Sequence, residues 1–161
     1  GLGLSKLSLP GSVTVAALTV VNAFGDVLAE DGSVLAGALV DGEFVNSHEY
    51  ILRLTEHPHF GRMEQTTLSV VITNARFSKT QCTAIARMAH DGMARAISPV
   101  HTPVDGDTIF VLSFGDRASN VFQAGLAAAD VVAASIRRAV RMAESLGGVK
   151  ALRDLERPLE Y

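Results

Sequence analysis

The sequence predicts an α/β layered domain, and three patterns carry that prediction. Residues 13–24 and 66–73 are rich in β-branched residues, which is typical of strands. Residues 79–97 and 121–146 place apolar side chains at helical spacing. Residues 108–114 form a continuous apolar run, which we expect to be a strand buried on both faces. A chain that mixes strands and amphipathic helices in this way folds into packed layers of the two.

The segments between these elements carry turn and cap signals. Residues 25–40 contain Gly-Asp and Asp-Gly turns and are expected to form a hairpin that continues the sheet of residues 13–24. Residues 41–65 are polar and have no clean period, so we expect a surface loop or linker. Ser78 and Gln81 have the spacing of a capping box, which predicts the start of the first helix.

Composition excludes several classes of protein. The 161 residues suffice for one domain, and a net charge of −3 argues against a nucleic-acid partner. No apolar run reaches the roughly 18 residues of a membrane span. Cys82 is the single cysteine, so no intrachain disulfide is possible; this suits a reducing compartment, and we expect a cytoplasmic location. Its place in the first turn of a helix predicts a lowered thiol pKa. The basic cluster of Arg137, Arg138 and Arg141 is expected to be a solvated helix face.

The acidic pair Asp105-Gly106-Asp107 is the first candidate for chemistry. It stands directly before the predicted strand 108–114, and the glycine lets both carboxylates approach one point. Adjacent carboxylates separate their pKa values and support acid–base work, and their oxygens also suit Mg²⁺ or Ca²⁺. An ordinary turn before a strand is the structural alternative.

Thr66 and Asn22 are the next candidates. A threonine hydroxyl is a weak nucleophile until a base lies beside it. A chain cut before Thr66 would supply that base, because a free α-amine has a pKa of about 7.7–8.0. Asn22 ends a predicted strand, where its amide could donate to a developing oxyanion. Without such a cut, Thr66 simply opens a strand and Asn22 forms a turn.

The histidines show no metal-binding pattern. His57 and His59 flank a proline without Cys, Asp or Glu at metal-ligand spacing, so a surface loop is the better interpretation. His101 precedes the acidic pair and could line a site, but a lone loop histidine is more often incidental. We expect neither a metal nor an organic cofactor.

Three blocks, in this order, resemble one known family: VTVAALTVVNAFGDVL, TTLSVVITNARFSKTQ and MAHDGMARAISPVHTPVDGDTIFVLS. The series is similar to the P1 or S58 peptidases, which include L-aminopeptidase/D-Ala-esterase/amidases, β-peptidyl aminopeptidases and nylon-oligomer hydrolases. The resemblance implies an αββα sandwich of the N-terminal-nucleophile type, only partly contained in this chain. Residues 1–65 would be the C-terminal end of an α chain and residues 66–161 a whole β chain.

The resemblance also implies roles for particular residues. The precursor would cut itself between Gln65 and Thr66, and Thr66 would then act as the nucleophile. Asp105 and Asp107 match the acid pair of the family's threonine branch and would orient Thr66 and tune its ammonium group. Asn22 would help to hold the oxyanion or the substrate. A catalytic Lys and a pocket Tyr would come from the preceding part of the precursor.

The function implied is that of a self-processing amidohydrolase or aminopeptidase. It would hydrolyse amide or ester bonds of small peptides or amides through an acyl-enzyme, as a homo-oligomer of αβ units. A first alternative is a non-processing member that serves as a binding or scaffold subunit, since Gln65 stands where the threonine branch usually carries Asn. A second alternative is an α/β domain in which His101 and the Asp105-Gly106-Asp107 segment bind a divalent metal.

Overall fold

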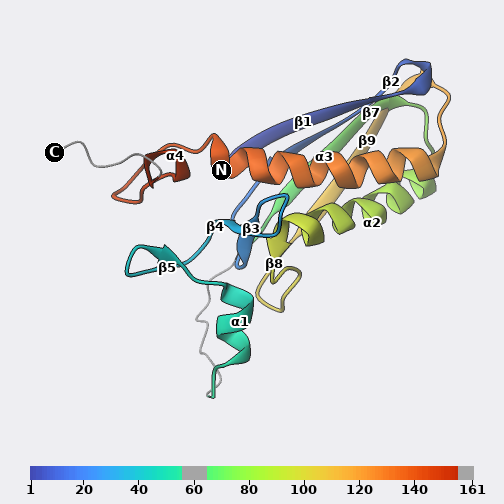
Figure 1. Ribbon diagram of the computed structural model, residues 1–161. Coiled ribbons are helices and arrows are strands. Elements are labelled where there is room, and N and C mark those ends of the chain that lie inside the picture. The colour runs from blue at the N-terminus through green and yellow to red at the C-terminus, as the bar shows by residue number, and fades with distance from the viewer. Residues whose placement is uncertain (56–64, 156–161) are drawn as a thin grey trace.

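A four-stranded sheet and two long helices form the body of the domain. The computed structural model describes residues 1–55 and 65–155. The sheet has the order β1-β2-β7-β9, in which β7 and β9 are parallel and the other neighbours are antiparallel. Helices α2 and α3 lie side by side on one face of it (Figure 1). The elements of this body are β1 (Leu2–Leu9), β2 (Val13–Val20), β7 (Leu68–Ala75), α2 (Lys79–Ala96), β9 (Thr108–Arg117) and α3 (Val121–Arg141).

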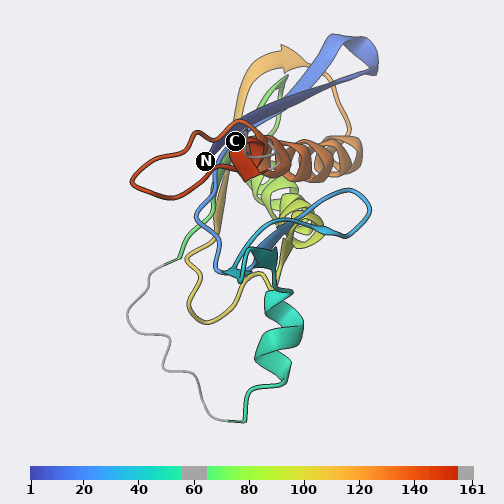
Figure 2. The ribbon, with the colours of Figure 1, turned by 60° about the vertical axis from the view of Figure 1, so that its left-hand side comes forward.

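The smaller elements lie beyond one end of this sheet, apart from a 3₁₀ turn between β1 and β2 and a short helix near the C-terminus. A three-stranded sheet has the order β4-β3-β8, and β5 pairs with β6 in a separate hairpin. Helix α1 extends away from the two layers (Figures 1 and 2). The buried carboxylate of Asp26 anchors it, accepting hydrogen bonds from the Ser47 backbone N–H and hydroxyl, each at 2.6 Å. These elements are η1 (Pro10–Ser12), β3 (Asp26–Leu28), β4 (Val34–Ala36), β5 (Leu39–Val40), β6 (Glu43–Phe44), α1 (Ser47–Leu52), β8 (Ile97–Ser98) and α4 (Leu152–Leu155).

Helix α2 begins at the predicted capping box. The Gln81 N–H donates to Ser78 Oγ at 3.3 Å, and the Ser78 N–H donates to Gln81 Oε1 at 2.8 Å. Both bonds satisfy donors that a helix leaves unpaired at its start. The helix then buries a stripe of small and apolar side chains against α3 and the sheet: Ile85, Ala89, Gly92, Met93 and Ala96.

Gly92 sets how closely α2 approaches α3. A Cβ at this position would lie 2.2 Å from the carbonyl oxygen of Ala129. We expect Gly92→Ala to lower the free energy of unfolding by about 2 kcal/mol, as overpacking does. In an uncrowded helix the same change would stabilise the protein. Gly125→Ala is the matched control, because its Cβ meets the flexible Met88 side chain, which can move. Equal losses for the two variants in urea unfolding would contradict this account.

The predicted helix 79–97 and strand 66–73 are confirmed as α2 and β7, with small shifts at their ends. Residues 25–40 do form a hairpin, but the expectation that it continues the main sheet is wrong. β2 ends at Val20, and β3 pairs instead with β4 and β8. Gly25 permits this departure, since a Cβ there would lie 2.0 Å from the Pro99 carbonyl oxygen.

Strand β1 and helix α1 are the longest of the elements that the sequence analysis did not predict. Strand β1 does not keep a strict alternation, because Lys6 takes an apolar place on the face that Leu2 and Leu4 occupy. Helix α1 lies inside the segment 41–65 that was expected to be a loop. It is six residues long, so it shows less than two helical periods, and Asn46 caps it by accepting from the Glu49 N–H at 3.1 Å.

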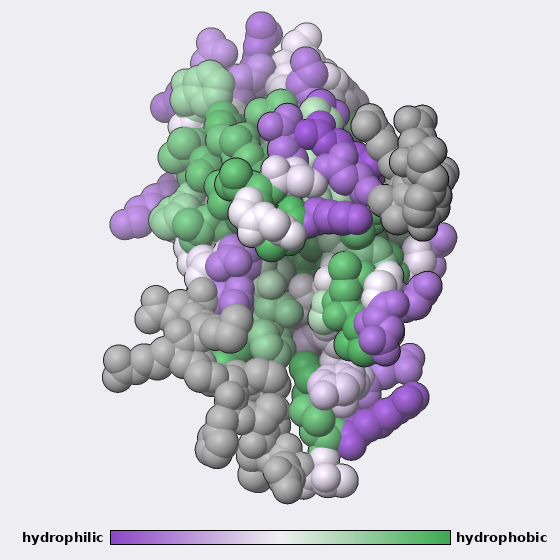
Figure 3. All heavy atoms as spheres, turned by 90° about the vertical axis from the view of Figure 1, so that its left-hand side faces the viewer, coloured by the Kyte–Doolittle hydropathy of each residue, from purple (hydrophilic) through white to green (hydrophobic). Residues whose placement is uncertain are grey.

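One face of the main sheet carries apolar side chains that no described element covers. The expectation that residues 108–114 are buried on both faces is wrong: Phe110, Leu112 and Phe114 are 56%, 53% and 73% exposed. They point away from α2 and α3, and hydrophobic side chains gather in the upper left part of Figure 3. We call this surface the open sheet face; its exposed members also include Leu2, Leu4, Leu18, Val20 and Leu68.

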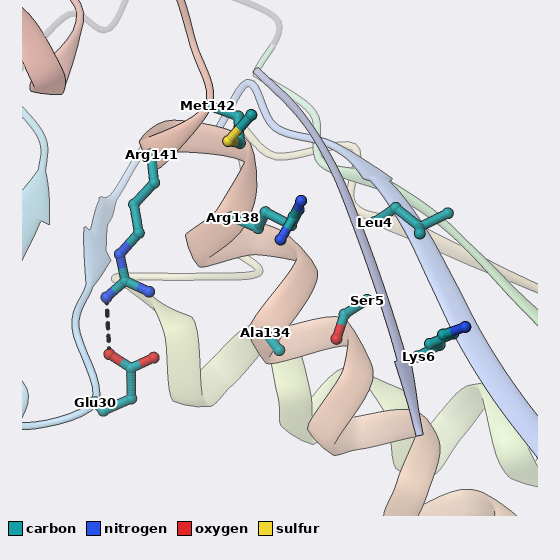
Figure 4. Close-up of a pocket in the computed structure, with 8 residues that line it drawn as sticks. All are labelled: Leu4, Ser5, Lys6, Glu30, Ala134, Arg138, Arg141 and Met142. Atoms are coloured by element: carbon teal, nitrogen blue, oxygen red, sulfur yellow. Dashed lines mark hydrogen bonds and ion pairs between the residues drawn. The ribbon is translucent and has the colours of Figure 1, made fainter. Parts of the chain in front are cut away.

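The arginine cluster of α3 is only partly solvated, which corrects the sequence-based expectation. Arg137 is held against the protein, where its Nε donates to the Leu28 carbonyl and its Nη2 to the Arg95 carbonyl, both at 2.9 Å. Arg141 pairs with Glu30 at 3.0 Å, and both side chains line a cavity of about 500 Å³ that Arg138 also lines (Figure 4). The hydrogen bond from Arg141 lowers the pKa of the Glu30 carboxyl. None of the described helices has the length and hydropathy of a membrane span.

Candidate active site

The peptide bond between Gln65 and Thr66 is held at both of its polar atoms. The Gly106 N–H donates to the Gln65 carbonyl oxygen at 2.8 Å, and the Thr66 N–H donates to the Asn22 carbonyl oxygen at 2.8 Å. Gln65 also forms an isolated parallel bridge with Asp105, just ahead of the β7–β9 pairing. The strand order therefore brings the segment after β2, the start of β7 and the loop before β9 to one place.

The Thr66 hydroxyl lies against the backbone of Gly106. A Cβ built on Gly106 would be 2.8 Å from Thr66 Oγ1 and 3.7 Å from its Cγ2. A glycine at this position gives the hydroxyl its space. Thr66 is half-buried, whereas the side chain of Thr67 is fully buried. Of these two neighbouring threonines, Thr66 therefore has the hydroxyl that a substrate can reach.

Asp107 joins the threonines to the loop before β9. Its side chain is only 3% exposed, and its Oδ1 accepts from the Thr67 N–H at 2.9 Å. Its Oδ2 lies 3.0 Å from Nδ1 of His101. Both carboxylate oxygens thus have partners, and the group fixes the backbone one residue beyond Thr66.

Asp105 has a different set of partners from Asp107. Its Oδ2 accepts from the Thr102 N–H at 3.0 Å and from the Thr102 hydroxyl at 2.6 Å. Its Oδ1 lies 3.4 Å from the backbone nitrogen of Phe24, which donates to it. Asp105 therefore fastens the loop before β9 to itself and to the segment that follows β2. Asp105 and Asp107 therefore stabilise the backbone on two sides of the Gln65–Thr66 peptide, from the two ends of residues 105–107.

The two asparagines have separate places. Asn22 is brought to Thr66 through its backbone carbonyl, and its side chain is exposed. Asn74 lies away from Thr66 and has a structural place. Its Oδ1 accepts from the Thr14 N–H at 2.8 Å and its Nδ2 donates to the Ser12 carbonyl at 3.0 Å, which fastens the turn between β1 and β2.

His101 was named in the sequence analysis as a residue that could line a site, although an incidental loop position was the more common case. In the structure it contacts Asp107, and its Nε2 lies 3.2 Å from Nδ1 of His90. His90 lies eleven residues earlier on α2, and nothing in the local sequence pairs the two. The expected lowering of the Cys82 pKa is also wrong, since burial raises the pKa of that thiol. His57 and His59 lie outside the described residues.

An apolar cavity of about 310 Å³ lies beside Asp105. Its wall includes Phe24 and Thr102, the two residues whose backbones donate to that carboxylate. Such a cavity is large enough for an aliphatic or aromatic group of a small molecule. Within residues 1–55 and 65–155, no three His, Cys, Asp or Glu side chains gather as a metal site would require.

The fold resembles that of one class of hydrolase. The solved structure of an L-aminopeptidase/D-Ala-esterase/amidase from Ochrobactrum anthropi, described as a variant of the Ntn hydrolase fold, superposes with a TM-score of 0.60 at 19% identity. The match covers 92% of this chain and 42% of that one. The expected fold class is thereby confirmed: the chain forms part of an α/β domain of the Ntn-hydrolase type.

Sequence similarity defines the family more narrowly than the fold does. Residues 1–153 match the family described as Peptidase family S58, and the chain belongs to this family. An uncharacterized aminopeptidase of Mycobacterium tuberculosis (strain ATCC 25618 / H37Rv) is 34% identical over 96% of this chain and 52% of its own length. A 6-aminohexanoate-oligomer endohydrolase of Agromyces sp. (strain KY5R) is 32% identical over 64% of this chain and 30% of its own. The chain therefore spans about half the length of the aminopeptidase and less than a third of the length of the endohydrolase.

Proposed function

We propose that this chain is part of a self-processing amidohydrolase that cuts itself between Gln65 and Thr66. The observation that carries the proposal is the pair of hydrogen bonds at that peptide bond, from Gly106 to its carbonyl and from its N–H to Asn22. A backbone N–H aimed at a carbonyl oxygen stabilises the negative charge that develops there under nucleophilic attack. The Thr66 hydroxyl lies next to the same glycine.

The proposed cut is an acyl transfer followed by hydrolysis. Thr66 Oγ1 attacks the Gln65 carbonyl carbon, and Gly106 donates to the resulting oxyanion. The C–N bond breaks and the hydroxyl proton passes to the leaving nitrogen, which leaves an ester on Oγ1 and a free α-amine on Thr66. Water then hydrolyses that ester. The Gln65 side chain takes no part in these steps, so Gln in place of Asn does not prevent them.

Hydrolysis of substrate then uses the same hydroxyl. The new α-amine, held beside the Asn22 carbonyl, accepts the proton of Thr66 Oγ1 as the hydroxyl attacks an amide or ester carbonyl. The side-chain amide of Asn22 and backbone N–H groups would donate to the oxyanion, and Asp107 would hold the backbone next to the nucleophile. The relatives named as an aminopeptidase and as a 6-aminohexanoate-oligomer endohydrolase support small peptides or amides as the substrate class.

The N-terminal part of the same precursor is the proposed partner of the open sheet face. Leu4, Leu18, Val70 and Phe110 stand in one row across all four strands and point to that side. A row of apolar side chains on an uncovered sheet favours a second layer. The curated relatives are long enough to supply that layer.

Intact mass of the purified full-length protein tests the cut. We expect two chains, separated between Gln65 and Thr66, and we expect Thr66→Ala to remain one chain. Cleavage at another bond, or cleavage that survives Thr66→Ala, would contradict the proposal. A wild-type protein that stays whole would favour the binding or scaffold subunit, because no free Thr66 amine would then exist.

A further inference from the structure

We infer that His101 is a positioning residue for Thr66 that acts through Asp107 and is itself held by His90; this role rests on the proposed function. The side chains of Asp107, His101 and His90 contact one another in that order. Nδ1 of His101 lies 3.0 Å from Asp107 Oδ2, and Nε2 of His101 lies 3.2 Å from Nδ1 of His90. The other oxygen of Asp107 accepts from the Thr67 N–H, one residue beyond the nucleophile.

The carboxylate fixes which nitrogen of His101 carries a proton. An ionised carboxylate only accepts hydrogen bonds, so Nδ1 of His101 must donate. Asp107 is almost fully buried, and a buried carboxylate is costly unless its oxygens are bonded. With His101 on Oδ2, the carboxylate is held in the rotamer that keeps Oδ1 on the Thr67 N–H. Without that donor, Oδ2 loses its partner and the carboxylate is free to turn.

His90 limits how His101 can move. The two rings meet edge to face, with centroids 4.8 Å apart. Burial lowers the pKa of His90, and the nearby charge of His101 lowers it further, while Asp107 and Asp91 oppose this. A neutral His90 accepts a hydrogen bond from a protonated His101 or donates one to a neutral His101. In both cases His101 keeps its Nδ1 proton for Asp107.

The backbone at His101 has a left-handed conformation, which sets the direction in which its side chain leaves the loop. His101 has a φ of 54°, a left-handed conformation that is uncommon for residues other than Gly, although Asn, Asp and His are enriched in it. Such conformations persist where the surrounding structure determines them, and they gather at functional sites. Here Asp105 fixes the next residue of the loop, Thr102, through two hydrogen bonds.

Two substitutions at this position separate the hydrogen bond from the backbone. His101→Gly relieves the left-handed backbone and removes the donor. His101→Asn tolerates the same backbone and returns a nitrogen donor near the place of Nδ1. Asp41→Gly is the matched control, since Asp41 is exposed in the β5–β6 turn and has a φ of 53°.

The experiment uses full-length protein and two readouts. The first is the amide hydrogen exchange of Thr67, with Val71 on the same strand as an internal reference. The second is the kcat of Thr66-dependent hydrolysis, measured apart from KM. We expect His101→Gly to speed Thr67 exchange about 10-fold and to lower kcat about 10-fold while KM and Val71 exchange stay constant. His101→Asn should restore both values to within about threefold of wild type.

Each outcome decides a separate point. Unchanged Thr67 exchange in His101→Gly overturns the inference, whether or not the protein is active. Faster exchange with unchanged kcat limits His101 to a structural role and also overturns it. If wild type shows no Thr66-dependent hydrolysis, the proposed function fails, and the role of His101 in positioning Thr66 for reaction fails with it. A loss in His101→Gly that His101→Asn does not reverse would show that the donor at Nδ1 is not the cause.

Discussion

Full-length protein carrying Thr66→Ala is expected to hydrolyse amide substrates about 1000-fold more slowly than wild type, or worse. Removing the attacking atom of a covalent hydrolase leaves only the contributions of binding and of the oxyanion donors. Thr66→Ser keeps an attacking hydroxyl and should retain hydrolysis to within about tenfold. The measurement is kcat/KM on a panel of aminoacyl amides, made on samples whose chain cleavage has been checked by mass.

Thr67→Val is the matched control for Thr66→Ala. Within the described part of the chain, the Thr67 hydroxyl is buried and has no hydrogen-bond partner. Valine keeps its shape and leaves untouched the backbone N–H that donates to Asp107. We therefore expect hydrolysis close to wild type and an unchanged or higher free energy of unfolding. Loss of hydrolysis in Thr67→Val together with activity in Thr66→Ala would place the nucleophile one residue further on.

The long elements could be predicted because their patterns repeat over several periods. Residues 79–97 show five helical turns of apolar spacing and a capping box, and α2 follows them closely. The expectation that residues 108–114 are buried on both faces was wrong for a different reason. An apolar run shows that both faces of a strand avoid water, but it does not show which part of the protein covers them. In β9 the helices cover one face, and Phe110 and Leu112 remain exposed on the other.

The acid pair could be recognised without any resemblance because its two members are neighbours in sequence. Asp105 and Asp107 stand out as a pair around a glycine, and the structure places both beside the Gln65–Thr66 peptide. His101 was only a possible site residue in the sequence, because its contacts with Asp107 and with His90 on another element do not show in the local pattern. Asn22 illustrates the converse. Its side chain drew attention in the sequence, whereas the described contact to Thr66 uses its backbone carbonyl.

Gly106→Ala is expected to lower kcat about 100-fold with little loss of stability. The new methyl group would lie 2.8 Å from Thr66 Oγ1, which is too close for both atoms to keep their places. Threonine is branched at Cβ and has few alternative rotamers, so its hydroxyl must shift or turn away. A misplacement of about 1 Å at a reacting atom is enough for a loss of this size. The N–H that donates to the Gln65 carbonyl is retained, so the unfolding temperature should change little.

The double variant Gly106→Ala with Thr66→Ser identifies the cause of that loss. Serine lacks Cγ2, and its hydroxyl can turn to a rotamer that avoids the methyl group while still facing a substrate. If the methyl group acts by displacing the hydroxyl, the double variant should be more active than Gly106→Ala alone, although Thr66→Ser by itself is slower than wild type. If the loss of activity in the double variant instead equals the product of the losses in the two single variants, the glycine acts on the backbone of the loop and not on the hydroxyl. A Gly106→Ala variant as fast as wild type would remove Gly106 from the account of the site, and the Thr66 hydroxyl would need another explanation for its reactivity.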